Sequence, residues 1–181
     1  DDLGHVVAPG FTGELWVRSD ATMKGYFDDP VATAESLQDG WLKTGDLFRQ
    51  DEEGYFYIVG RKKDMVRKNS ENISCREVEE IIRRIPEVAE VAMVAVRDDL
   101  VGEEPKVYIQ LREGLSTEQM PPVRIIEFCA RELAQFKMPR YIEYVAAFPM
   151  TESARVAKKA LVAGATDLRA NSYDRINGVW R

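Results

Sequence analysis

The sequence is poor in the residues that build metal sites and disulfide frameworks. Its 181 residues include two cysteines, Cys75 and Cys129, and one histidine. The cysteines lie far apart without CxxC or Cys/His spacing, so neither a zinc site nor a disulfide framework is indicated. A reducing, cytoplasmic setting therefore fits best.

A surplus of positive charge and a long apolar run are also lacking. The formal net charge of −6 argues against a nucleic-acid-binding protein, because affinity for a phosphate backbone needs an excess of Lys and Arg. No apolar run is long enough to span a membrane, and no signal segment opens the chain. The chain starts at Asp1 and runs straight into strand-like sequence, so we expect a fragment of a longer protein.

The pattern of apolar residues predicts an α+β fold. Residues 13–18 and 55–59 read as strands. A helix is predicted after Ser74, which forms a capping box with Glu77, and Pro86 marks its end. Strands are expected over 88–96, 107–111 and 141–145. The apolar positions expected to form one face of a second helix are Val123, Ile126, Cys129 or Ala130, and Leu133.

Four motifs follow one another in a fixed order. Residues 13–15 (Gly-Glu-Leu) with 23–27 (Met-Lys-Gly-Tyr-Phe) come first, and 44–46 (Thr-Gly-Asp) come second. Residues 60–64 (Gly-Arg-Lys-Lys-Asp) and 71–79 complete the series. Their order and spacing resemble the late core motifs of the adenylate-forming superfamily of acyl-CoA synthetases, peptide-synthetase adenylation domains and luciferases. Within it, Cys75 and residues 128–139 look most like the crotonobetaine/carnitine-CoA ligase branch.

The resemblance implies three parts. Residues 1–62 would be the β-rich end of an N-terminal AMP-binding domain, and residues 63–165 a mobile C-terminal lid of a sheet with helices. Residues 166–181 have little apolar periodicity and are expected to form a surface tail.

The resemblance also assigns roles around the nucleotide. Asp46 would accept hydrogen bonds from the two ribose hydroxyls, and Arg61 would donate to ribose and phosphate oxygens. Lys63 stands at the hinge, whose torsions change as the lid rotates between two half-reactions. From the residues alone, Asp46 could instead be a turn aspartate bonded to its own backbone, and Arg61 and Lys63 could be solvated charges.

A coenzyme A site is implied after the hinge. Residues 69–72 (Asn-Ser-Glu-Asn) align with a loop that lies against the pantetheine arm of CoA in relatives, so Ser70, Glu71 and Asn72 are expected to border CoA. Relatives have paired glycines there, where this chain has Asn69 and Ser70. Because serine tolerates positive φ poorly, a differently shaped loop is expected.

The last motif departs from the family at its reacting group. Relatives carry a lysine that pairs with the acyl carboxylate and the α-phosphate as the adenylate forms. Here the glycine of that motif is Ala154 and the lysine is Arg155. Arginine keeps the charge but spreads it over a planar fork, so Arg155 could do a weaker version of the work, Lys158 or Lys159 could reach in, or adenylation could be lost.

The resemblance therefore implies an AMP-forming acyl-CoA synthetase, which turns a carboxylic acid, ATP and CoA into acyl-CoA, AMP and pyrophosphate. No Ser/Thr/Gly-rich phosphate loop and no GxxxxGK motif occurs, so we expect the chain to need a missing N-terminal domain. That domain would hold the acid and the ligands of Mg²⁺, which arrives with ATP. The alternatives are a peptide-synthetase adenylation domain and a non-catalytic nucleotide- or CoA-binding module.

Overall fold

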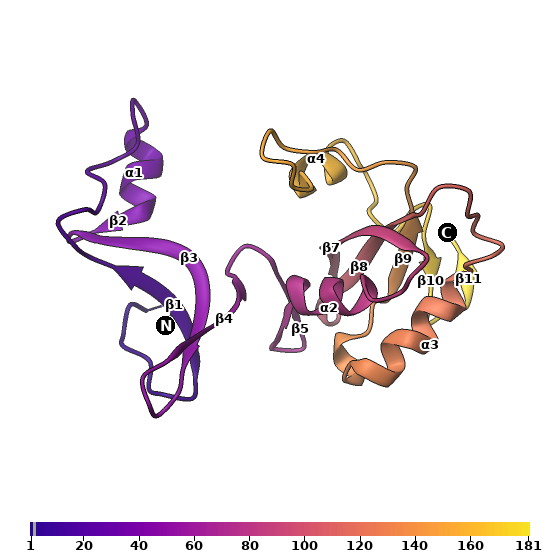
Figure 1. The fold of residues 1–181 in the computed structure, drawn as a ribbon, viewed down its shortest axis with the longest axis horizontal. Coiled ribbons are helices and arrows are strands. Elements are labelled where there is room, and N and C mark those ends of the chain that lie inside the picture. The colour runs from indigo at the N-terminus through magenta and orange to yellow at the C-terminus, as the bar shows by residue number, and fades with distance from the viewer. Residues whose placement is uncertain (2) are drawn as a thin grey trace. The chain divides into compact units, whose positions relative to one another are not determined.

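The computed structural model describes residues 1 and 3–181, which form two compact units, Asp1–Lys63 and Asp64–Arg181 (Figure 1). Both strands and helices are present, so the predicted α+β class is confirmed. In the described part of the chain, no helix has the length and apolar character that crossing a membrane requires.

The first unit is an antiparallel sheet with one short helix. Its elements are β1 (Thr12–Val17), α1 (Pro30–Ser36), β2 (Leu37–Gln38), β3 (Trp41–Gln50) and β4 (Phe56–Arg61). The long strand β3 pairs with each of the other three strands. Helix α1 begins where the Asp29 carboxylate accepts a hydrogen bond from the backbone N–H of Ala32 at 2.8 Å.

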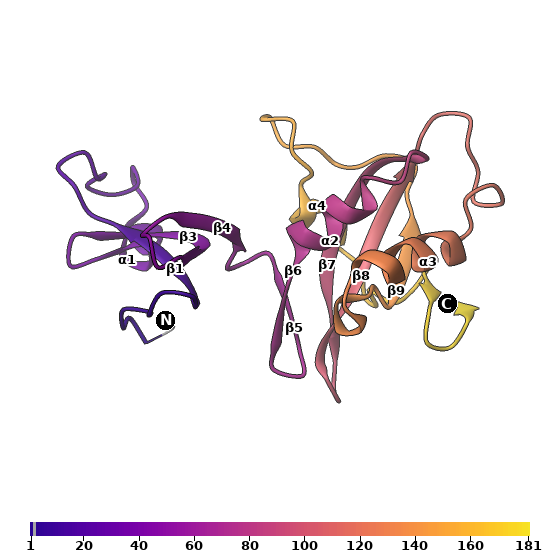
Figure 2. The ribbon, with the colours of Figure 1, turned by 60° about the horizontal axis from the view of Figure 1, so that its bottom comes forward.

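The second unit is a mixed sheet with helices. Its strands are β5 (Met65–Lys68), β6 (Glu71–Ser74), β7 (Val88–Asp98), β8 (Gly102–Leu111), β9 (Tyr141–Tyr144), β10 (Tyr173–Asp174) and β11 (Val179–Trp180). Its helices are α2 (Cys75–Ile82), α3 (Pro122–Glu132), the 3₁₀ turn Gln135–Lys137, and α4 (Lys158–Val162). Strand β8 is central, antiparallel to β7 and parallel to β9. Figure 2 shows the β5–β6 hairpin beside the turned end of β7 and β8, where Lys68 pairs with Gly102.

Alternating side chains of β7 and β8 give this sheet two apolar faces. Val91, Met93 and Val107 belong to the main core with α2 and α3, whereas Ala92 and Tyr108 belong to a smaller cluster. Val156 and the α4 residues Leu161 and Val162 pack against that smaller cluster. The predicted cap of α2 is confirmed, since the Ser74 hydroxyl accepts a hydrogen bond from the N–H of Glu77.

The predicted apolar face of the second helix is confirmed at Cys129 and Leu133, which are buried, and is wrong at Val123. Helix α3 buries Pro122, Ile125 and Cys129, whereas the Val123 side chain is exposed. Because the helix begins at Pro122, the i, i+3, i+7 series starts one residue before the position expected from the sequence.

The segment expected to be a surface tail also differs from expectation. Within residues 166–181, β10 pairs with β9 and with β11, and Ser172 and Asp174 are fully buried. The cause is polar. Asp174 accepts hydrogen bonds from Arg181 and Asn177, and the buried Lys106 ammonium donates to the carbonyl of Leu168. Apolar periodicity does not reveal contacts of this kind.

Candidate functional site

The Thr44-Gly45-Asp46 motif forms a bulge in the first unit. Glu14 pairs with Leu47 and Trp16 with Lys43, so three residues of β3 stand opposite one residue of β1. Gly45 has φ +72°, a left-handed conformation that glycine adopts without strain. Asp46 follows the bulge within β3.

The bulge is held by side chains around it. The Thr44 hydroxyl donates to the Leu15 carbonyl at 2.8 Å, and the N–H of Gly45 donates to Glu14 Oε1 at 3.0 Å. The other oxygen of Glu14 accepts from Lys62 Nζ at 3.1 Å. Burial raises the pKa of Glu14, but the hydrogen bonds from Lys62 and Gly45 outweigh this and hold the pKa below its ordinary value. A buried carboxylate thus fixes the turn that carries Asp46.

Asp46 and Arg61 are brought together. They stand opposite each other in the β3–β4 ladder, and Arg61 Nε donates to Asp46 Oδ1 at 2.7 Å. The Asp46 side chain is 30% exposed and that of Arg61 is 64% exposed. A carboxylate held this way from one side can still accept hydrogen bonds from a pair of hydroxyls on the other.

The predicted hinge residue lies at the end of the first unit. Lys63 is exposed, and the boundary between the two compact units falls directly after it. The next residue, Asp64, belongs to the second unit.

Residues 69–72 form a hairpin turn and the start of a strand. Lys68 pairs with Glu71, so Asn69 and Ser70 alone make the turn, and both have positive φ, 48° and 68°. The chain therefore keeps the left-handed conformations that glycines would supply, although it has Asn and Ser. Glu71 and Asn72 are exposed residues of β6, which corrects the expectation that all four residues form a loop.

Arg155 ends a small closed loop in the second unit. The loop is closed by Thr151, whose N–H donates to the Arg155 carbonyl at 2.7 Å and whose hydroxyl accepts from the Arg155 N–H at 3.1 Å. Ala154 has φ +55°, so the family glycine is replaced at a position with left-handed backbone. The Arg155 guanidinium is exposed and makes no ion pair with any residue that the structure describes.

Lys158 and Lys159 have different surroundings. Lys158 Nζ contacts Asp64 Oδ1 at 2.5 Å and Glu79 Oε1 at 2.7 Å, with 26% of its side chain exposed. Burial lowers the pKa of Lys158, but the Glu79 carboxylate outweighs this and holds the pKa above its ordinary value. Lys158 is thus a cation already paired with two carboxylates, whereas Lys159 is exposed.

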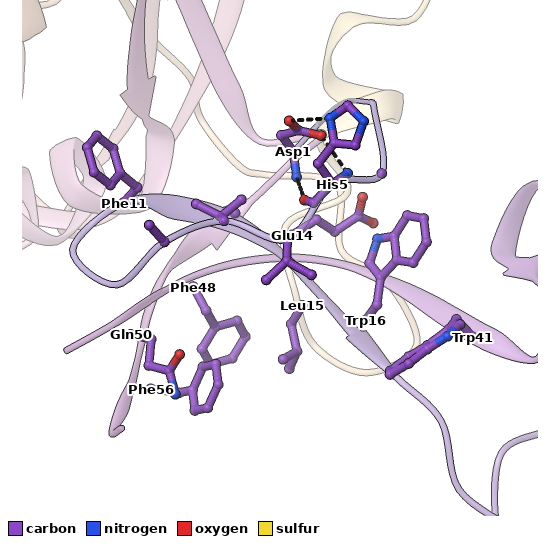
Figure 3. Close-up of a pocket in the computed structure, with 15 residues that line it drawn as sticks. Asp1, His5, Phe11, Glu14, Leu15, Trp16, Trp41, Phe48, Gln50 and Phe56 are labelled. Atoms are coloured by element: carbon purple, nitrogen blue, oxygen red, sulfur yellow. Dashed lines mark hydrogen bonds and ion pairs between the residues drawn. The ribbon is translucent and has the colours of Figure 1, made fainter. Parts of the chain in front are cut away.

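A cavity of about 430 Å³ lies within the first unit (Figure 3). Its lining is largely apolar and includes Val7, Phe11, Trp16, Phe48 and Phe56. Neither Asp46 nor Arg61 lines it, so it is separate from the predicted nucleotide residues.

Sequence reasoning missed two groups of residues. Glu14 lies in the first motif, which gives it no role of its own, and the Asp64–Glu79–Lys158 cluster joins three segments that no motif connects. A signal for the cluster exists, because Glu79 follows Val78 on the apolar side of a helix and a carboxylate there needs a partner. In the described residues, no group of three or more His, Cys, Asp or Glu side chains is arranged to hold a metal ion.

Comparison with known proteins gives consistent matches. Residues 77–155 match the AMP-binding enzyme C-terminal domain. The chain is 38% identical over 158 residues to the mitochondrial medium-chain acyl-CoA ligase of Rattus norvegicus, covering 87% of this chain and 25% of that protein. It is 36% identical over 165 residues to the crotonobetaine/carnitine–CoA ligase of Salmonella arizonae, covering 89% and 31%.

A solved structure matches as well. The o-succinylbenzoate CoA synthetase of Bacillus subtilis, in complex with its acyl-adenylate intermediate, has a TM-score of 0.76 at 32% identity over 91% of this chain and 33% of that one. The chain therefore spans about a quarter to a third of the length of these relatives.

Proposed function

We propose that this chain, which belongs to the adenylate-forming enzymes through its AMP-binding C-terminal domain, is part of an AMP-forming acyl-CoA synthetase. It would form the C-terminal part of that enzyme. In the first half-reaction a carboxylate oxygen attacks the α-phosphorus of ATP, and the bond to the β-phosphate breaks to release pyrophosphate. In the second, the sulfur of CoA attacks the acyl carbonyl, the thioester forms, and AMP leaves.

The observation that carries the proposal is the Asp46–Arg61 pair. The bulge at Gly45 sets the Asp46 carboxylate beside Arg61 at 2.7 Å, with part of both side chains exposed. Asp46 would bind the two ribose hydroxyls, and Arg61 would donate to ribose and phosphate oxygens. The ribose does not react, so the contacts that Asp46 and Arg61 would make with it serve both half-reactions.

The second unit would supply the reacting and acceptor sides. Arg155 is exposed at the end of its loop. Its positive charge would stabilise the negative charge that develops on the α-phosphate oxygens in the transition state. The turn at Ser70 and the exposed Glu71 and Asn72 would border CoA. Lys63 would be the hinge between the two poses of this unit. Lys158 is not the replacement for the family lysine in this proposal, because Asp64 and Glu79 already bind it.

The remaining substrates complete the proposal. The carboxylic acid and Mg²⁺, which neutralises the ATP phosphates when bound, would contact residues of an N-terminal domain outside this chain. We place the protein in the cytoplasm because Cys75 and Cys129 are both free and buried, as in a reducing compartment.

The test is pyrophosphate release by the full-length protein with a panel of carboxylic acids, with and without CoA. The panel holds carnitine-like, short, medium and aryl acids. Release that depends on one acid class, with CoA consumed, supports the ligase and identifies its substrate. Asp46→Ala should abolish release by weakening ATP binding, whereas Asp99→Ala, at an exposed aspartate of the second unit, should not.

A non-catalytic module that binds nucleotide or CoA is the second candidate, favoured by Arg155 and Ala154 in place of the family lysine and glycine. AMP binding without pyrophosphate release from any acid would select it. Release in which a carrier-protein thiol replaces CoA would select the peptide-synthetase type of adenylation domain.

A further inference from the structure

Three segments that are distant in sequence meet at the Lys158 ammonium. Asp64 is the first residue of the second unit, Glu79 lies on α2, and Lys158 begins α4. Glu79 is additionally fixed to the sheet, because its Oε1 accepts the N–H of Met93 at 2.7 Å. Asp64 is fixed to α2, because its carbonyl accepts the N–H of Cys75 at 3.1 Å.

Lys158 is also three residues from Arg155 along a short, constrained segment. Between them, Val156 packs against the cluster of Ala92, Tyr108 and Phe148, and the N–H of Ala157 donates to the Pro149 carbonyl at 2.8 Å. Among the residues that the structure describes, the Arg155 guanidinium makes no ion pair, and the backbone of Arg155 is hydrogen-bonded to Thr151 within its own loop. The orientation of this loop in the unit therefore depends on the segments beside it, where the charged anchor is Lys158.

We propose that Lys158 is a positioning residue for the adenylation half-reaction, which ties the Arg155 loop to Asp64 and Glu79 so that Arg155 moves as one body with the start of the second unit. This inference rests on the proposed function. A loop joined to the residue directly after the hinge keeps its orientation when the hinge torsions change. A misplacement of about 1 Å at a reacting group can lower a rate by roughly 100-fold, so such an anchor has a kinetic effect.

The chemistry of the cluster makes the anchor specific. Without the Lys158 ammonium, the carboxylates of Asp64 and Glu79 would have no cation between them and would repel each other. Lys158→Met keeps most of the side-chain volume and removes the charge, whereas Lys158→Arg keeps the charge. Arg131→Met is the matched control, because Arg131 is an exposed cation on α3 of the same unit.

The first experiment is amide hydrogen exchange of the full-length protein, followed by mass spectrometry over residues 150–157. Lys158→Met should speed exchange there by about tenfold or more, with the exchange of α3 unchanged, and Lys158→Arg should restore most of the protection. Equal protection of residues 150–157 in Lys158→Met and Arg131→Met would overturn the anchoring, whatever the activity of the protein.

The second experiment separates the half-reactions in the full-length protein. Lys158→Met should lower pyrophosphate release by about tenfold or more, with the KM for ATP within about twofold. The rate of thioester formation from supplied acyl-adenylate and CoA should stay within about twofold. Equal losses in both half-reactions would show a merely structural role and overturn the proposal. If the unaltered protein releases no pyrophosphate, the proposed function fails, and the exchange experiment alone decides whether Lys158 is an anchor.

Discussion

At the scale of single residues, backbone conformation explains how the chain tolerates departures from its family. Asn69, Ser70 and Ala154 all adopt positive φ, at places where the resemblance to the adenylate-forming motifs implies glycine. The sequence shows the substitutions, but it does not show whether the backbone changes with them or stays and becomes strained. In the structure the backbone keeps its left-handed conformation at these residues and is strained there, because neighbouring hydrogen bonds hold the turns closed.

Replacing Ser70 by glycine should therefore stabilise the second unit. A two-residue hairpin turn with positive φ at both positions favours Asn-Gly, and serine lacks the side-chain amide that makes Asn tolerable there. We expect the free energy of unfolding of Ser70→Gly to rise by about 1 kcal/mol, measured by urea denaturation. Ala163→Gly is the control, since Ala163 has φ −64° and glycine should destabilise there. A loss of stability in both variants would refute the account of the turn.

Glu14 should control AMP affinity without touching the nucleotide. Its carboxylate fixes Gly45 and Lys62, so Glu14→Ala should loosen the bulge and weaken AMP binding by about tenfold. Glu14→Gln keeps an acceptor for the Gly45 N–H and should lose less. Calorimetric titration of the full-length protein measures this, with Glu53→Ala in an exposed turn as control. Unchanged affinity in Glu14→Ala would show that the bulge does not position Asp46.

At the scale of elements, the predictable parts were those with apolar periodicity and a capping signal. Helix α2 follows from Ser74, Glu77 and the apolar face that begins at Val78. The bulge at Gly45 and the strand β10 do not follow, because each contacts a charged group from a distant segment. That group is Glu14 at the bulge and Arg140, whose Nε lies 3.5 Å from Asp174 Oδ1, at β10. The pairing of Asp46 with Arg61 required the register of β3 and β4, which no local pattern contains.

Asp174 of β10 makes the free energy of unfolding fall at acid pH. Burial raises the pKa of Asp174, but the hydrogen bonds from Arg181 and Asn177 outweigh this and hold the pKa below its ordinary value. The unfolded chain therefore takes up this proton at a higher pH than the folded chain does, so this contribution is present above about pH 4 and is lost as the pH falls below it.

Asp174→Asn should accordingly cost about 2 kcal/mol of unfolding free energy at pH 7, and less at pH 3. Urea denaturation at the two pH values measures the difference. Asp99→Asn, at an exposed carboxylate, serves as control and should show little change at either pH. An equal cost for Asp174→Asn at both pH values would contradict the assignment of this contribution to Asp174.

At the scale of the whole molecule, the residues that we propose for the site fall into two sets in two compact units. Asp46 and Arg61 belong to the first, whereas Ser70, Glu71, Asn72 and Arg155 belong to the second. The resemblance predicts a division after residue 62, and the compact units divide one residue later, after Lys63. No local pattern predicts this division, because lysine at a unit boundary has no distinctive pattern. In our account, the first unit holds the nucleotide throughout, and the second contributes Arg155 to one half-reaction and the Ser70 turn to the other.

The most direct test of this account is the rate of each half-reaction in the full-length protein with Arg155→Ala. We expect pyrophosphate release to fall by about 100-fold, while thioester formation from supplied acyl-adenylate and CoA stays near the unaltered rate. That result would show that Arg155 acts only in the first half-reaction. Unchanged pyrophosphate release, or an equal loss in both half-reactions, would contradict the account.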